Sequence, residues 1–313
     1  MLSRIADSMY WLNRYLERSE SILRTMHTSY VLSLDKSPYG INSWEPLLQV
    51  FTYLDNEQIA DLEKRPNDIL QHVMLDPKNL NSLKVVLNRA RENARGMQDH
   101  ITKEVWEQVN LMYHTINNPK IAKQIKGSEQ LPMMENLLKN CLLYTGITDS
   151  TMPRGMGWNF MNLGKFLERC LITIELTDNL FKTIDYDLDN NKDILYWRNL
   201  LFSLSGYEFH LKNYRSNETN HNVAHQVIFN PHFPHSINYS MTRVGKYLEA
   251  VVNENDPKGK NTLLKQFGRL SSSVEFADFE WIRKNGLPNF LGETRNELIN
   301  FSKSFSQTFF SYS

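Results

Sequence analysis

The sequence predicts an all-α fold, and three observations lead to this prediction. Apolar residues recur at intervals of three and four along several long segments, which is the spacing of one face of an α-helix. Sustained alternation of apolar and polar residues, the mark of a half-buried strand, is missing from the sequence. The dipeptide Asn285-Gly286 is typical of a tight hairpin, but Leu287-Pro288 follows it, and this order indicates the end of a helix.

The first predicted helix lies near the amino terminus. Five apolar residues there follow one another in steps of four, three, four and seven, so they share one face of a helix. They are Ile5, Met9, Leu12, Leu16 and Leu23. The same kind of spacing predicts further helices over residues 80–87 and 163–174.

Proline, glycine and asparagine mark the expected ends of the helices. The breaks are expected at residues 37–40, Asp76-Pro77, 117–119, 148–157, Asn230-Pro231, Asp256-Pro257 and 286–288. None of these segments has the composition of a flexible linker. We therefore expect one compact unit of long helices.

A repeated heptapeptide suggests that the chain is internally duplicated. Residues 12–18 read LNRYLER and residues 163–169 read LGKFLER, so Leu, a cation, an aromatic residue, Leu, Glu and Arg recur in the same order. We call Glu17-Arg18 and Glu168-Arg169, within these heptapeptides, the two Glu-Arg motifs. One match of seven residues between two helices is weak evidence, so further anchors are needed.

Two further pairs of anchors follow in the same order. Trp44-Glu45-Pro46-Leu47-Leu48 resembles Trp197-Arg198-Asn199-Leu200-Leu201, and the Asp-Pro turn at 76–77 resembles the Asn-Pro turn at 230–231. The three pairs lie 151, 153 and 154 residues apart, a far longer period than that of a solenoid. We predict two pseudo-symmetric helical halves, 1–150 and 151–313, each with one Glu-Arg motif.

The composition restricts the classes of partner. Lys plus Arg and Asp plus Glu each number 35, so the net charge is zero and no global field favours nucleic acid or an anionic membrane. No stretch approaches the roughly 20 apolar residues of a membrane span, and a charge at Arg4 precedes any apolar run of signal-peptide length. We expect a cytoplasmic protein, in which Cys141 and Cys170 are reduced packing thiols.

The Glu-Arg motifs are the first candidate site. Arg14 and Glu17 fall on a stripe of the first helix opposite its apolar face, with Arg18 beside it. Their counterparts in the second half are Lys165, Glu168 and Arg169. The charges are therefore expected on the face away from the core.

Three interpretations of the motifs stay open. The i,i+3 pairs would stabilise a solvated helix face by about 0.2–0.5 kcal/mol each. Alternatively, the two faces form one cleft, in which arginine binds a carboxylate or phosphate and glutamate binds an amine or acts as a base. The third interpretation is a buried ion-pair network that fixes how the halves dock.

A second candidate strip lies in the first half, on a helix expected to continue as far as Glu107. It contains four charged residues, Arg89, Arg91, Glu92 and Arg95, with Arg91 and Arg95 one turn apart. Either this is an ion-paired surface or it binds an anion. In the second interpretation, Arg154 and Trp158 line the same cleft.

Metal and nucleotide sites are not expected. His221 and His225 form an i,i+4 pair with Glu218 nearby, but a di-iron bundle needs two Glu-x-x-His helices and only one is present. Gly155-Met156-Gly157 lacks the third glycine and the preceding strand of a dinucleotide loop. We therefore expect no metal and no cofactor, and no nucleophile with a matching base is recognisable.

The ordered set of motifs resembles the bacterial alpha-E family, helical proteins named for a Glu-Arg motif. The resemblance rests on residues 4–7, Tyr10-Trp11, 14–18, Glu20, 88–95, 104–107, 151–154, 157–158 and 163–169. It runs from near residue 1 to about residue 240. The last ~60 residues, with Phe301, Phe305 and Phe309, match more loosely, and Lys165 stands where arginine is usual.

This resemblance implies a partner rather than a reaction. The usual companion of such proteins is a circularly permuted ATP-grasp protein, often with a transglutaminase-like protease, in a system that makes or processes amide-bonded peptides. We expect an accessory subunit that binds the ligase, an anionic amino acid or a peptide through the Glu-Arg faces. The alternative is a small-molecule enzyme, with Glu17 or Glu168 as acid–base group and Arg18, Arg169 and Arg154 as an anion clamp.

Overall fold

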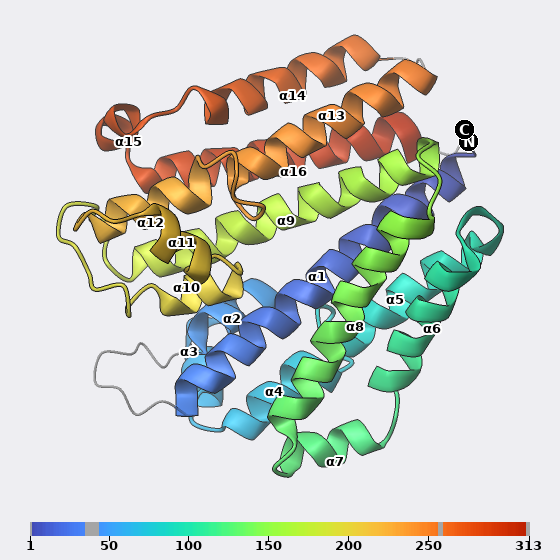
Figure 1. Ribbon diagram of the computed structural model, residues 1–313, viewed down its shortest axis with the longest axis horizontal. Helices are drawn as coiled ribbons and strands as arrows, with labels where there is room; N and C mark the ends of the chain where they lie inside the picture. The colour runs from blue at the N-terminus through green and yellow to red at the C-terminus, as the bar shows by residue number, and fades with distance from the viewer. Residues whose placement is uncertain (1, 35–43, 256–258, 311–313) are drawn as a thin grey trace. The chain divides into compact units, whose positions relative to one another are not determined.

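The computed structural model describes residues 2–34, 44–255 and 259–310 (Figure 1). These residues form sixteen α-helices and one short 3-10 helix, with no strand among them. The predicted all-α fold is confirmed. The chain divides into two compact units, unit 1 with Met1–Arg14, Pro153–Ile194 and Ser205–Ser313, and unit 2 with Tyr15–Met152 and Leu195–Leu204.

The helices of the first half of the chain are α1 Ser3–Leu34, α2 Glu45–Phe51, α3 Asn56–Leu62, α4 Pro66–Leu75, α5 Leu83–Gly96, α6 Lys103–Ile116, α7 Lys120–Lys126 and α8 Gln130–Thr151. Those of the second half are α9 Met156–Lys182, α10 Arg198–Ser203, α11 Tyr207–Asn213, α12 Thr219–Ile228, α13 Ile237–Asn255, α14 Lys260–Glu275, α15 Phe279–Asn285 and α16 Leu287–Phe310. The 3-10 helix is Gln98–His100.

Unit 1 is built on four long helices. Helix α9 packs against α13 and α16, α13 packs against α14, and α14 packs against α16, so the four close into a bundle (Figure 1). The turn between α15 and α16 is made at Gly286, whose φ of 89° favours glycine. The helix stop predicted at this position is confirmed.

The aromatic residues at the carboxyl end of α16 belong to the core of unit 1. Phe301, Phe305 and Phe309 are buried, and the rings of Phe305 and Phe309 lie 4.8 Å apart. Phe305 also lies 5.5 Å from the ring of Tyr10 on α1. The burial of these rings attaches the first turns of α1 to unit 1.

Unit 2 is a second helical assembly. Helix α6 packs between α5 and α8, and α4 packs against α5 and α7. Asp55 caps α3 in a capping box with Gln58, and the hydroxyl of Thr102 accepts a hydrogen bond from the first turn of α6. Trp44 is buried against Tyr30, with their ring centroids 6.4 Å apart.

The sequence anchors of the predicted duplication stand at comparable places in the secondary structure. Trp44 directly precedes α2 and Trp197 directly precedes α10, each with helical φ and ψ. Ser82 directly precedes α5, and Ser236 directly precedes α13. These parallels support an internal duplication, which stays a prediction here.

Some predicted boundaries differ from the structure. The helix expected from residue 80 begins at Leu83, and the helix expected to carry the arginine strip on to Glu107 ends at Gly96, after which α6 begins at Lys103. The breaks predicted at 37–40 and 256–257 lie outside the described residues. Across the described part of the chain, no helix combines the length and apolar character that crossing a bilayer requires.

Candidate functional site

A buried ion pair links the two repeated heptapeptides within unit 1. Arg14 Nε, on α1, donates to Glu168 Oε2, on α9, at 2.7 Å. The two side chains are only 9% and 3% exposed. Because both groups are removed from water, each depends on the other for compensation of its charge.

Two hydroxyl groups complete this network. Tyr10 Oη and Ser302 Oγ lie 2.9 Å apart, and Arg14 Nη1 donates to both at 3.2 Å. Burial alone would lower the pKa of Arg14, but Tyr10 and Glu168 together outweigh it and hold this pKa above its usual range. The guanidinium also lies 4.6 Å from the ring centre of Trp11.

The expectation that the charged stripe lies away from the core is wrong. Arg14, Glu17, Glu168 and Arg169 are all buried. Helix α9 is buried on more than its apolar face. Polar residues such as Thr173 are buried along with its apolar residues. A helical wheel identifies the apolar face, but it does not reveal a second buried face whose polar groups find partners.

Gly164 is what allows α1 and α9 to approach so closely. A Cβ atom added at this position would lie 2.2 Å from the carbonyl oxygen of Tyr10 and 3.2 Å from Cγ of Arg14. Only glycine fits where the two backbones meet. The sequence did contain this signal, because LGKFLER has glycine at the place where LNRYLER has Asn13.

The arginines of the two Glu-Arg motifs both reach a loop that precedes a long helix. Arg18 Nη1 donates to Asn81 Oδ1 at 2.8 Å in unit 2, just before α5. Arg169 Nη1 donates to the carbonyl of Pro234 at 3.3 Å in unit 1, just before α13. Each arginine thus contacts the loop before a helix of its own unit, through a side-chain oxygen in one case and a backbone carbonyl in the other, and both contacts support the fold.

Glu17 of the first motif and Glu20, three residues further on, lie near a buried thiol in unit 2. Glu20 accepts a hydrogen bond from Arg24 at 2.7 Å. Cys141 is fully buried, and burial raises its pKa, with Glu20 and Glu17 adding to the rise. The thiol is therefore held protonated and is a packing group, as the sequence predicted.

The sequence pattern of one protein family matches residues 1–310, and its description is a predicted alpha-helical domain with a conserved ER motif. The chain belongs to the Alpha-E family. The match extends through α16, beyond the part in which the resemblance was clear from the motifs alone. Neither the curated proteins nor the solved structures gave a match.

The arginine strip of this Alpha-E chain lies on α5 in unit 2. Arg91 Nε donates to Asn110 Oδ1 at 2.8 Å, and its guanidinium lies 4.4 Å from the ring centre of Tyr113. Arg95 donates to Glu92 at 2.6 Å, and Arg89 is exposed. Arg91 is therefore a half-buried cation on an aromatic residue, and Arg95 and Glu92 form an exposed pair.

The entry to α9 presents another cation on an aromatic ring, in unit 1. The guanidinium carbon of the exposed Arg154 lies 3.7 Å from the ring centre of Trp158. Further along α9, the cationic groups of Lys165 and Arg169 lie 5.9 Å and 5.2 Å from the ring centre of Phe166. These residues form a helical strip of cations and aromatic rings.

The histidines of this Alpha-E chain lie among aromatic rings in unit 1. The rings of His221 and Phe279 are 3.6 Å apart, and Nδ1 of His225 is 2.7 Å from the hydroxyl of Tyr214. Burial lowers the pKa of both histidines. Among the residues that the structure describes, no group of three or more His, Cys, Asp or Glu side chains is arranged to hold a metal ion.

Proposed function

We propose that this Alpha-E chain is a helical accessory subunit of an ATP-grasp-associated system that forms or processes amide bonds. In this proposal it binds the ligase, an anionic amino acid or a peptide, and a transglutaminase-like protease is a possible third component. The ATP-grasp partner is proposed because the family resemblance implies it. The cations at the start of α9 and along it support an anionic ligand.

The observation that carries the proposal is the stacked cation at the start of α9. Arg154 lies on Trp158, and stacking on an aromatic face orients the plane of its guanidinium group. Planar, bidentate donation suits a carboxylate or a phosphate. Lys165, seven residues after Trp158, falls on the same face of α9 and adds a second cation to the one at Arg154.

Binding is better supported than acid–base catalysis. Glu168 Oε2 already accepts from Arg14 at 2.7 Å in a buried pair, so a substrate proton would have to compete with a guanidinium for that oxygen. Arg18 and Arg169 each hold a loop of their own unit. Three of the groups named for the alternative enzyme, Glu168, Arg18 and Arg169, are thus engaged in holding the fold.

Co-purification from the native cell tests the proposal. A tagged chain is recovered under mild conditions, and the bound proteins are identified by mass spectrometry. We expect an ATP-grasp protein with the wild-type chain and its loss with Arg154→Gln. Because Arg154 is exposed, this substitution should change the free energy of unfolding by no more than about 0.5 kcal/mol.

Lys182→Gln is the matched control, because Lys182 is an exposed cation in the last turn of the same helix. It should leave recovery unchanged. If no ATP-grasp protein is recovered with the wild-type chain, the proposed partner is wrong. Equal recovery with Arg154→Gln would instead remove the α9 strip from the binding surface.

A further inference from the structure

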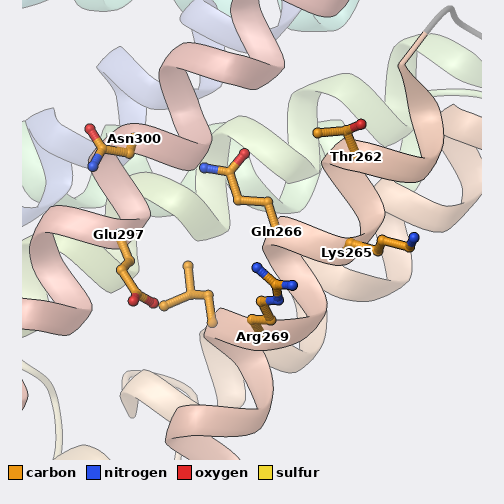
Figure 2. Close-up of a pocket in the computed structure, with 7 residues that line it drawn as sticks. Thr262, Lys265, Gln266, Arg269, Glu297 and Asn300 are labelled. Atoms are coloured by element: carbon orange, nitrogen blue, oxygen red, sulfur yellow. The ribbon is translucent and has the colours of Figure 1, made fainter.

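A polar groove of about 490 Å³ lies between α14 and α16 in unit 1. Lys265, Gln266 and Arg269 on α14 line it together with Glu297 and Asn300 on α16. In Figure 2, Gln266 and Arg269 lie on the side of α14 nearer Glu297, and the side chain of Lys265 extends the other way. Cations thus line one wall of the groove and a carboxylate lines the other. This volume is within the range of about 300–1,000 Å³ that is usual for ligand sites.

A second hollow of about 220 Å³ adjoins the first, because Glu297 lines both. It is apolar where the first is charged. Phe276, Trp281 and Phe290 line it together with Glu293. Phe276 is 78% exposed and Trp281 is 40% exposed, so these two large rings present apolar surface to solvent.

The charged groups of this groove have no ion-pair partner within the described parts of the chain. This holds for Lys265, Arg269, Glu293 and Glu297. Other exposed charges of unit 1 do pair, for example Arg295 with Glu175. A ligand could therefore engage these groups without first displacing a protein partner.

The groove is long and its chemistry changes along its length. Residues 262, 265, 266, 269, 272 and 273 of α14, and Phe276 directly after its end, line the two hollows at helical spacing. At 1.5 Å per residue, the distance from Thr262 to Phe276 along the helix is about 21 Å. An extended peptide of about six residues covers the same distance.

We propose that this groove binds a short extended peptide with a free carboxylate. Lys265 and Arg269 receive the carboxylate, Glu297 and Glu293 receive a basic side chain, and Phe276 with Trp281 receives an apolar side chain. The order of the groups along the groove sets the order in the peptide: apolar, basic, then the carboxyl terminus. The inference does not depend on the α9 strip or on the ATP-grasp partner.

Charge complementarity is the argument for this occupant. A polyanion would meet Glu293 and Glu297 as well as the cations, and a purely apolar helix would leave four charges desolvated without partners. A peptide that carries both signs satisfies each group. It also matches the apolar end, which a free amino acid is too short to reach.

The test uses as its probe N-acetyl-phenylalanyl-glycyl-glycyl-lysyl-glycyl-alanine, a six-residue peptide with a free carboxylate, titrated into the full chain by calorimetry. Three matched peptides accompany it: the carboxyl-terminal amide, a version with norleucine for lysine, and a version with alanine for phenylalanine. We expect each change to weaken binding. The Lys265→Gln/Arg269→Gln double variant should weaken binding of the probe by about tenfold, because two charge contacts are lost.

Each contact is identified by combining a variant of the groove with the peptide that lacks the matching group. Glu297→Gln should weaken binding of the lysine probe but leave the norleucine peptide unchanged. Lys303→Gln, an exposed cation of α16 outside the groove, should leave binding of the probe unchanged. The proposal is overturned if the probe fails to bind or if the amide binds as tightly as the acid.

Discussion

Arg14 and Glu168, 154 positions apart in the sequence, form a buried ion pair whose Nε and Oε2 atoms lie 2.7 Å apart. One residue belongs to LNRYLER and the other to LGKFLER, so the two repeated heptapeptides are joined by a direct charge contact within unit 1. The hydroxyl groups of Tyr10 and Ser302 surround the same guanidinium. Of the three interpretations of these motifs, the buried network describes this pair best.

Breaking the pair should therefore cost stability. Arg14→Gln and Glu168→Gln should each lower the free energy of unfolding by about 3–5 kcal/mol, because each leaves a buried charge without compensation. The double variant Arg14→Met/Glu168→Leu should recover most of this loss, since Tyr10 and Ser302 can still bond to each other. Guanidinium denaturation of wild type, the two single variants and the double variant gives the four free energies of unfolding to be compared. Single variants within 0.5 kcal/mol of wild type would show that the pair is not a structural one.

The close approach of α1 and α9 predicts a severe effect at Gly164. Gly164→Ala should destabilise the protein by about 3 kcal/mol or more, because the new methyl group would lie 2.2 Å from the carbonyl oxygen of Tyr10. Gly146→Ala on α8 is the control, since a Cβ there meets nothing within 4 Å. It should stabilise the helix by up to about 1 kcal/mol. Thermal melts that rank the two variants in the opposite order would contradict the described crossing.

The histidines of unit 1 predict a loss of stability in mild acid. Burial lowers the pKa of His210, His221 and His225 below the ordinary value of 6.5. The unfolded chain therefore binds more protons than the folded one as the pH falls below about 6.5, and the free energy of unfolding falls with it. Chemical denaturation at pH 7.5 and 5.5, above the range in which most carboxylates titrate, measures the change.

His210→Gln should flatten this dependence, because His210 is buried against Gln226. His232→Gln replaces an exposed histidine and should leave the dependence as it is in the wild type. A free energy of unfolding that stays constant or rises as the pH falls from 7.5 to 5.5 would contradict the lowered pKa of these three histidines.

The two thiols should report on the two units separately. Cys170 lies in unit 1 and Cys141 in unit 2, and burial raises the pKa of both. Since the thiolate is the reactive form, both should resist iodoacetamide in the folded protein and react once guanidinium unfolds it. Mass spectrometry of tryptic peptides resolves the two sites. Rapid labelling of either thiol under native conditions would show that its unit opens readily.

The positions of helices could be predicted from the sequence, because a helix depends on apolar residues that recur at intervals of three and four along the chain. The apolar steps from Ile5 to Leu23 and the stop at Gly286 correspond to helices and a turn in the structure. The Glu-Arg motifs and their neighbours were sufficient to indicate the family, which matches residues 1–310. Duplication of the halves, by contrast, stays a prediction from three ordered anchors.

The sequence by itself determined the helical class, the family and the residue types of the candidate site. Only the tertiary structure decided that Arg14 and Glu168 are buried partners, and that charges of opposite sign face each other between α14 and α16. The physical reason is the separation in sequence between the residues that interact. Helical periodicity is fixed by neighbours three and four residues away, whereas the burial of a charge depends on which distant residue compensates it.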